Sequence, residues 1–167
     1  GRVAQILRSV STALRVLGPS PFDFVMHASL PALRSAFEGF RHRFSTGEDL
    51  AGMLRGARRV IQCHGSLENA FAAGLRPEHE TVLPALTAFA RALRSAGAGA
   101  CFLLPRPEKG SACKRWHLYL RWMVRKDEVD PGGWDRVPPS RLVVPLDTHM
   151  HRIGLRLGGT ARKQADA

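Results

Sequence analysis

Two short segments of this chain carry residue types that can act on an anionic partner. In the first, a proline-bearing turn leads to Ser111, which can cap a helix whose first turn holds Lys114 and Arg115. Cations in the first turn of a helix usually cost a few tenths to ~1 kcal/mol, so this placement needs a reason. A bound phosphate is one such reason, since Arg115 would share it with the exposed amides of Gly110, Ser111 and Ala112.

A second reason concerns the amine of Lys114 itself. The field at a helix start and the neighbouring cations disfavour a charged amine, which frees its lone pair to act as a nucleophile. The alternative is that both cationic side chains simply point into water.

The second segment begins at Asp147, which stands just before the apolar helical positions Met150, Ile153 and Leu157. Aspartate is a favourable residue at a helix N-terminus, so Asp147 taken alone is interpreted as a structural cap. The two histidines that follow are two positions apart and do not share a helix face. We therefore expect no metal site in this segment.

Apolar residues recur at helical spacing along most of the chain and predict an all-α class. No segment alternates long enough to predict a sheet, and residues 142–144 are the only β-flavoured run. Both ends of the chain lie inside helical patterns, so we expect a fragment truncated at both ends. Helices are predicted over residues 3–17, once or twice within 22–42, and over 46–65, 66–74, 79–95, 111–124 and 147–158.

Composition narrows the class of partner. The 167 residues include 25 Lys and Arg against 14 Asp and Glu, a net charge of +11, and 44% are hydrophobic, which excludes a disordered basic tail. No stretch approaches the ~20 apolar residues of a membrane span, and no signal peptide is visible. Three widely spaced cysteines exclude a disulfide framework and fit a reducing cytosol. A compact basic domain of this kind usually binds nucleic acid.

Together, the two segments resemble the helix-hairpin-helix (HhH-GPD) superfamily of base-excision DNA glycosylases. More closely, the chain resembles an uncharacterised bacterial domain-of-unknown-function family within that superfamily. The 33 residues from Lys114 to Asp147 are similar to the spacing in archaeal 8-oxoguanine glycosylases. The residues that carry the resemblance are Gly110-Ser111-Ala112-Cys113-Lys114-Arg115, Leu120-Arg121-Trp122-Met123-Val124-Arg125-Lys126-Asp127, Val129-Asp130-Pro131-Gly132-Gly133-Trp134 and Leu146-Asp147-Thr148-His149-Met150-His151-Arg152.

The resemblance implies a fold of two helical lobes around a DNA-binding cleft. Residues 1–126 would form a lobe ending in the hairpin and the lysine helix, and residues 127–167 a connecting loop and the aspartate helix of the second lobe. Lys114 would be the nucleophile that forms an imine with the sugar. Asp147 would stabilise the positive charge that develops on the sugar and deprotonate the nucleophile. The implied activity is excision of a damaged base, an oxidised purine above all, with AP-lyase strand cleavage.

Further residues are expected to contact DNA. The aromatic residues Trp116 and Trp122 are candidates for the pocket of a flipped base, although an aromatic residue on such a helix is more often part of the core. The basic cluster at residues 41–43 is either a DNA contact or plain surface, and Arg162 and Lys163 are further basic candidates. The expected DNA-binding residues are Gly110, Ser111, Arg115, Arg125, Lys126, His151 and Arg152.

No cofactor is expected. The iron–sulfur loop found in one branch of the superfamily needs four close cysteines, which this sequence lacks. The usual hairpin Leu-Pro-Gly-Val-Gly is replaced by residues 104–110, which keep one of its two glycines, so a monovalent cation is not carried over to this hairpin. We expect a monomer in the bacterial cytoplasm, nucleoid-associated, bound to double-stranded DNA and not to membranes.

Two other functions are open at this stage. One is a non-catalytic DNA-binding protein that recognises bent or damaged duplex on the same scaffold. The other is a basic helical adaptor for RNA or for an acidic protein. Covalent chemistry on DNA distinguishes the enzyme from the non-catalytic DNA-binding protein, because these two would have similar DNA affinity and similar salt dependence of binding.

Overall fold

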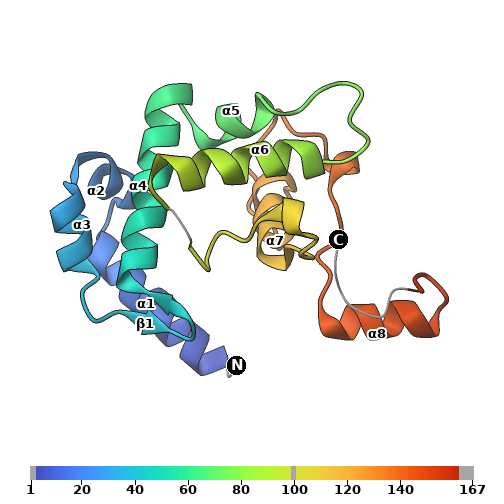
Figure 1. Ribbon diagram of the computed structural model, residues 1–167, viewed down its shortest axis with the longest axis horizontal. Coiled ribbons are helices and arrows are strands. Elements are labelled where there is room, and N and C mark those ends of the chain that lie inside the picture. The colour runs from blue at the N-terminus through green and yellow to red at the C-terminus, as the bar shows by residue number, and fades with distance from the viewer. Residues whose placement is uncertain (1–2, 99–100, 162–167) are drawn as a thin grey trace. The chain divides into compact units, whose positions relative to one another are not determined.

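The computed structural model describes residues 3–98 and 101–161 (Figure 1). These residues are mostly helical, which confirms the all-α class. They fall into two compact units. Unit 1 comprises the described parts of Gly1–Gly65 and Ala92–Leu104, and unit 2 comprises those of Ser66–Arg91 and Pro105–Ala167.

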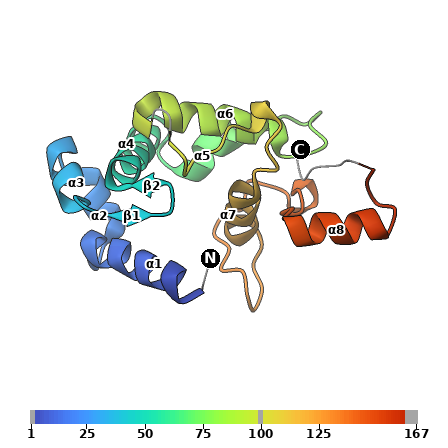
Figure 2. The same cartoon turned by 60° about the horizontal axis from the view of Figure 1, so that its bottom comes forward.

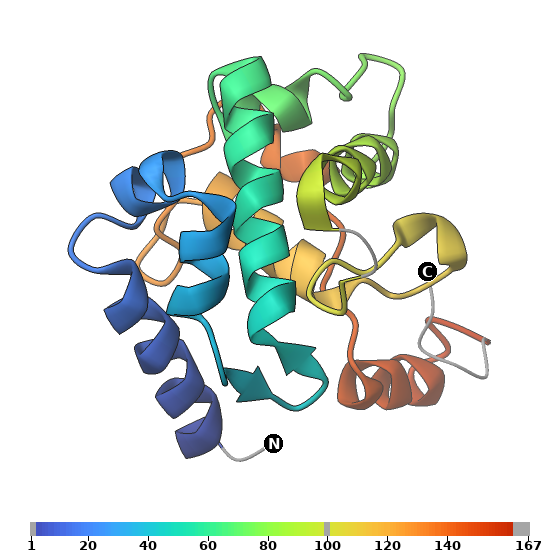
Figure 3. The ribbon, with the colours of Figure 1, turned by 60° about the vertical axis from the view of Figure 1, so that its left-hand side comes forward.

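Unit 1 is built around one long helix, α4, with three shorter helices and a pair of short strands before it (Figure 3). A two-residue loop joins the strands of a small antiparallel pair just before α4. The elements are α1 (Val3–Leu17), α2 (Pro21–His27), α3 (Leu30–Ala36), β1 (Arg41–His42), β2 (Ser45–Thr46), α4 (Gly47–His64) and the π-type turn η1 (Arg94–Ala98).

Unit 2 contains the segments that carry the predicted chemistry. Most of α6 belongs to it, and the last two residues of that helix belong to unit 1. The elements are α5 (Leu67–Ala72), α6 (Leu83–Leu93), the 3-10 turn η2 (Pro107–Lys109), α7 (Lys114–Val124), the 3-10 turn η3 (Pro139–Arg141) and α8 (Thr148–Arg156).

Local capping explains where several helices begin. Thr46 and Asp49 form a capping box at α4: the Asp49 amide donates to Thr46 Oγ1 over 3.3 Å, and the Thr46 amide donates to Asp49 Oδ2 over 2.8 Å. Ser20, Ser29 and Ser66 cap α2, α3 and α5 through a single type of bond, in which the serine side chain accepts an amide hydrogen of the first turn. Pro31 lies in the first turn of α3, where the backbone N–H that proline lacks would have no partner within the helix.

The strands do not lie where the sequence indicated. The residues 142–144, which have β-forming side chains, form no strand in the structure, whereas β1 and β2 pair through Arg41 with Thr46 and His42 with Ser45. Two residues per strand are too few for a period-two pattern, so the pairing depends on the two-residue loop and on the neighbouring helices. Figure 2 shows the strand pair beside α1.

The core of unit 1 forms where α3 packs on α4. Leu33, Phe37, Ala51 and Val60 are buried there. Gly56 lies on α4 directly against the carbonyl of Leu93, and a Cβ atom at this position would overlap that oxygen. The glycine therefore permits a backbone contact that any side chain would prevent.

The core of unit 2 is aromatic. Phe71 on α5 and Phe89 on α6 lie against each other, with ring centroids 5.6 Å apart, and both contact Trp134. Trp116 on α7 contacts Phe89 with ring centroids 5.8 Å apart. Tyr119 completes this cluster, and burial raises its pKa to about 12. The cluster fixes α7 through one face.

Within residues 3–98 and 101–161, no helix is both long and apolar enough to cross a membrane.

Candidate functional site

Helix α7 begins differently from the sequence prediction. Its N-cap is Cys113 and not Ser111, and Cys113 adopts a left-handed backbone conformation with φ +47°. Ser111 lies two residues before Cys113, and its Oγ accepts the amide hydrogen of Cys113 over 3.3 Å. The predicted cap was wrong because the chain turns sharply at Cys113. Lys114 and Arg115 nevertheless lie in the first turn of α7, as expected.

The turn before α7 is held by its own hydrogen bonds. Gly110 has φ +72° and its amide donates to the Pro107 carbonyl over 3.1 Å. This amide is therefore used inside the turn, and the expectation that it is exposed for phosphate binding was wrong. Trp116 pins the turn to α7, because its Nε1–H donates to the Pro105 carbonyl over 3.0 Å.

Asp147 caps α8. Its Oδ1 accepts the amide hydrogens of His149 over 3.0 Å and Met150 over 2.8 Å. These bonds satisfy two of the amides that a helix start leaves unpaired, and the positive end of the helix favours the carboxylate. The structural role that the local sequence predicts for Asp147 is confirmed.

The other carboxylate oxygen of Asp147 points to Lys114. Lys114 Nζ lies 2.9 Å from Asp147 Oδ2, so residues 33 apart in sequence form one ion pair within unit 2. The lysine side chain is 45% exposed and the aspartate side chain 31%, which leaves the pair accessible from solvent. The site thus joins the starts of two helices, with an amine on one and a carboxylate on the other.

These partners set the charge of Asp147. Its hydrogen bond from the Met150 amide, followed by the bond from Lys114, lowers its pKa from 3.8 to about 2. Asp147 is therefore an anion throughout the physiological range. A carboxylate with so low a pKa is a strong electrostatic partner and a poor proton acceptor.

The arginines after α7 belong to a local ion network. Asp130 is fully buried, and its Oδ2 lies 2.8 Å from Arg121 Nε and 3.5 Å from Arg125 Nε. Arg125 also pairs with Asp127 at 2.7 Å. The structure thus engages Arg125, an expected DNA contact, in two ion pairs that fix the loop at residues 125–134. Sequence reasoning missed Asp130, although its place before Pro131 and two glycines marks a turn.

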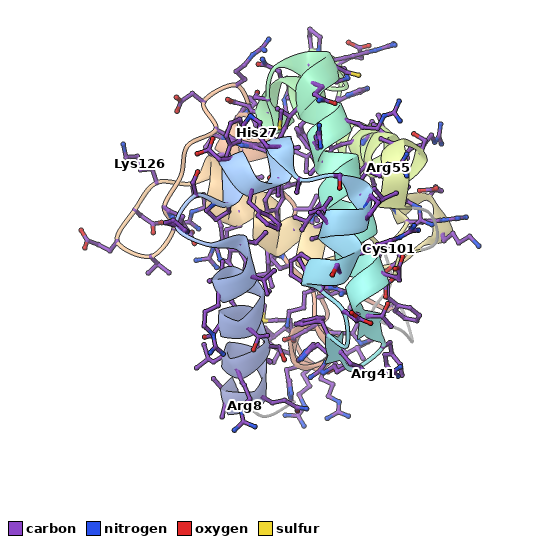
Figure 4. The ribbon with its side chains drawn as sticks, turned by 90° about the vertical axis from the view of Figure 1, so that its left-hand side faces the viewer. Arg8, His27, Arg41, Arg55, Cys101 and Lys126 are labelled. Atoms are coloured by element: carbon purple, nitrogen blue, oxygen red, sulfur yellow. The ribbon has the colours of Figure 1, made fainter. Side chains whose placement is uncertain are left out.

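The cations near Asp147 lie on or beside α8. Arg152 is exposed and, with His149 and Arg156, lines a hollow of about 240 Å³. His151, another expected DNA contact, is buried with only 7% of its surface exposed, because it faces inward on α8. Lys126 is exposed on the loop after α7, where Figure 4 labels it, and Arg115 is exposed in the first turn of α7. Arg162 and Lys163 lie outside the described residues.

The two tryptophans expected to hold a base differ in environment. Trp116 is 6% exposed and packs in the aromatic core, so its ring supports α7. Trp122 is 47% exposed, so much of its side chain faces solvent.

One histidine of α7, which the sequence indicates is a packing or surface group and not a ligand, lies in the core. His117 is buried, and its Nδ1 has no hydrogen-bond partner among the described residues. Burial lowers the pKa of its imidazole, which keeps the ring neutral. The sequence places His117 about one helical turn after Lys114, but it does not show that the ring is buried.

The described residues contain no cluster of three or more His, Cys, Asp or Glu side chains suited to a metal ion. Cys63 is exposed, and Cys101 and Cys113 are buried; all three are free thiols. Burial raises the pKa of the Cys101 and Cys113 thiols, so both are protonated near neutral pH.

Comparison with known proteins gives one result. The chain matches no curated protein and no solved structure at a significant level. Residues 1–167, the whole sequence, match the family model described as "Protein of unknown function (DUF2400)". The chain, and with it the lysine–aspartate pair described above, therefore belongs to the DUF2400 family.

Proposed function

We propose that this chain is a DNA repair protein of the helix-hairpin-helix glycosylase type, which excises a damaged base, an oxidised purine above all, and cleaves the strand through an AP-lyase step. The observation that carries the proposal is the 2.9 Å contact between Lys114 Nζ and Asp147 Oδ2. These are the two side chains that such a reaction needs, and they meet from distant parts of the sequence. In this proposal the turn at residues 105–113 and helix α7 form the second half of the hairpin motif.

The chemistry requires an amine nucleophile and a stabilising anion. The Lys114 ammonium first gives a proton to water, and the neutral amine then forms a bond to the anomeric carbon as the bond from that carbon to the base breaks. The departing base takes the electron pair and is protonated. The amine then loses its proton as the sugar opens, which leaves an imine between Nζ and the sugar carbon, and β-elimination from this imine cleaves the strand.

Asp147 contributes through its charge. Departure of the base places positive charge on the sugar, and a carboxylate within reach of that carbon lowers the barrier. Because the pKa of Asp147 is about 2, it does not readily take the Lys114 proton in the resting pair. That proton therefore needs another acceptor, such as water. DNA phosphates that enter beside the pair would weaken the ammonium–carboxylate contact and so free the Lys114 side chain.

The electrostatic surroundings suit double-stranded DNA. The chain carries a net charge of +11, and Arg115 is exposed in the first turn of α7 and Arg152 on α8. Such cations contact phosphates and replace condensed counterions, which gives binding a steep salt dependence.

A non-catalytic DNA-binding protein is the second candidate, and one observation favours it. Both groups of the pair are already satisfied: Lys114 by Asp147, and Asp147 by the amides of His149 and Met150 as well. An ion pair of this kind can serve only to hold two helix starts together. Covalent capture distinguishes the two candidates.

The test is borohydride trapping with duplexes that contain 8-oxoguanine, uracil, thymine glycol or an abasic site. Reduction of the imine converts it to a stable amine bond, so an enzyme of this type gives a covalent protein–DNA adduct. Lys114→Arg should abolish the adduct, because a guanidinium retains the charge and the ion pair but does not form the imine. Asp147→Asn should retain DNA binding and lose base release.

Lys109→Ala is the matched control, since Lys109 is an exposed lysine of the turn before α7. It should leave the adduct unchanged. DNA binding without an adduct on any substrate, with the wild-type protein, would exclude the lysine mechanism and favour the non-catalytic candidate. An adduct that persists in Lys114→Arg would show that a different amine reacts.

A further inference from the structure

A second surface, in unit 1, is marked by two aromatic rings that face water. Phe44 is 77% exposed and Phe102 is 62% exposed, yet their ring centroids lie only 5.5 Å apart with planes tilted by 30°. Large aromatic side chains in a folded chain are generally buried, and an exposed pair in contact leaves a continuous apolar surface in solvent. We infer that Phe44, Phe102 and the neighbouring Arg41 and Arg43 form a nucleic-acid contact that inserts an aromatic wedge beside an unpaired base.

The charge around the rings selects the partner. Phe44 is in the loop between β1 and β2, and residues 41–47 contain two arginines and no acidic residue. Arg41 and Arg43 are both exposed. In Figure 4 Arg41 lies at the same end of unit 1 as Arg8 of α1. Apolar rings flanked by cations match a nucleic acid, where bases offer flat apolar faces and phosphates offer negative charge.

The hairpin that carries Phe44 has an unusual backbone. Its two-residue loop consists of Arg43 and Phe44, and Arg43 has φ +54°. A tight hairpin loop needs a positive φ at its first residue, where glycine, asparagine or aspartate is the usual choice. An arginine here retains a conformation that is unfavourable for it, and such strain gathers at functional positions. Arg43 is therefore at the tip of the loop, next to Phe44 in the sequence.

The chain segments that carry the two rings are held by hydrogen bonds of the neighbouring residues. His42 Nδ1 lies 2.8 Å from Ser9 Oγ, which fastens the hairpin to α1, and the Gly47 amide donates to the Phe40 carbonyl over 2.9 Å. On the other side Cys101 is buried, and its Sγ–H donates to the Asp49 carbonyl over 3.6 Å. Arg94 donates to the Leu104 carbonyl over 2.7 Å. A wedge that is fixed before binding loses little conformational entropy on insertion.

This inference concerns unit 1 and uses neither Lys114 nor Asp147. It therefore stands or falls separately from the proposed reaction. The lysine–aspartate pair could be inactive while the aromatic wedge still binds DNA, and the converse also holds.

The test uses the full chain and a duplex with one unpaired 2-aminopurine, whose fluorescence rises when it leaves its neighbours. Wild-type protein should raise this fluorescence on binding, with affinity measured by anisotropy. The double variant Phe44→Ala, Phe102→Ala should lose the rise and weaken binding roughly 5- to 100-fold, the effect typical of one lost stacking contact. Arg43→Gly should keep the rise and reduce the salt slope by about one.

Phe22→Ala is the matched control, because Phe22 is also exposed in unit 1 but lies on α2. It should change neither signal, and Phe44→Trp should preserve both. Equal affinity and an equal rise in the double variant would overturn the inference. A double variant that binds DNA normally but loses self-association in sedimentation would overturn it in favour of contact with a second copy.

Lys114→Ala separates this inference from the proposed reaction. That variant should keep the 2-aminopurine rise whatever its trapping result. Loss of the rise in Lys114→Ala, with the rings intact, would show that the signal comes from the lysine site and would contradict the wedge.

Discussion

Each unit contains a group of contacting aromatic rings, and the two groups differ in how much of their surface is exposed. In unit 2 the rings of Phe71, Phe89, Trp116 and Trp134 pack against one another and are buried. In unit 1 Phe44 and Phe102 pack only partly, and most of their surface remains in water. Buried rings stabilise the fold, whereas exposed rings offer their area to a partner.

Each aromatic group lies next to a different kind of charge. The buried cluster supports α7, whose first residue Lys114 is paired with Asp147 at 2.9 Å. The exposed pair is flanked by arginines, and Arg43 among them has an unfavourable backbone conformation. Unit 2 therefore presents a fixed pair of opposite charges, and unit 1 presents positive charge beside apolar area. In the two proposals above, the reaction and the aromatic contact with nucleic acid are therefore assigned to separate parts of the chain.

The largest effect should come from emptying the buried cluster. Phe89→Ala removes a ring that is 2% exposed and contacts three other aromatic residues, so we expect stability to fall by about 3–5 kcal/mol. Urea denaturation followed by tryptophan fluorescence measures this. Phe44→Ala should lower stability by less than about 1 kcal/mol, because its ring is mostly exposed. Equal losses of stability in the two variants would contradict the difference between the buried and the exposed aromatic rings.

A smaller loss should follow from crowding the core of unit 1. Gly56→Ala places a methyl group against the Leu93 carbonyl, and the backbone shift needed to relieve it should cost about 1–3 kcal/mol. The midpoint of urea denaturation gives the value. Gly154→Ala on α8 is the comparison, because the added methyl meets only Thr160 at an ordinary 3.5 Å. That variant should be neutral or up to about 1 kcal/mol more stable; a similar loss in both would contradict the close contact at Gly56.

The strained loop of unit 1 should respond in the opposite direction. Arg43→Gly permits the positive φ without steric cost and should raise stability by about 1 kcal/mol while reducing DNA affinity. Thermal denaturation and anisotropy measure the two changes. Arg41→Gly, in strand β1, lacks that benefit and should lower stability by about 0.5–1 kcal/mol. A loss of stability in Arg43→Gly would show that its backbone is not under strain.

The finest test concerns the charge pair of unit 2. Lys114→Ala should raise the pKa of Asp147 from about 2, but not fully to 3.8, because the Met150 amide makes the larger contribution. The lowered pKa means that the folded state gains stability above pH 3.8 and loses it as pH falls from 3.8 to about 2. NMR titration of the Asp147 carboxyl carbon measures the shift. An unchanged pKa in the variant would contradict the ion pair, and Lys109→Ala serves as the control.

Local signals in the sequence were reliable where neighbours alone decide the structure. The apolar spacing at residues 3–17 predicts α1 over its observed range, and Asp147 caps α8 as its position before an apolar helical pattern indicated. The helix predicted over residues 79–95 begins later, at Leu83, because residues 75–82 form turns. The sequence predicts reliably that a helix is present. It predicts the ends of the helix less well, because these depend on turns whose sequence signals are weaker.

Site residues were harder to predict, because each depends on contacts from elsewhere. Arg125 is an exposed cation in sequence terms, but Asp127 and the buried Asp130 pair with it. Trp116 and Phe44 are both aromatic residues near basic neighbours, and only packing separates the buried ring from the exposed one. The basic cluster at residues 41–43 was visible in the sequence, whereas its aromatic partner Phe102 is distant in sequence and was not.

By itself, the sequence determined a basic, mostly helical chain with its lysine and aspartate at the starts of two helices. Helical periodicity and caps act over a few residues, so adjacent side chains suffice to predict them. Only the tertiary structure decided that Lys114 lies within 2.9 Å of Asp147, that Cys113 takes a left-handed conformation, and that Phe44 meets Phe102 in solvent. These features join segments that are distant in sequence or follow from how the chain turns between them, and burial and pairing there are set by packing.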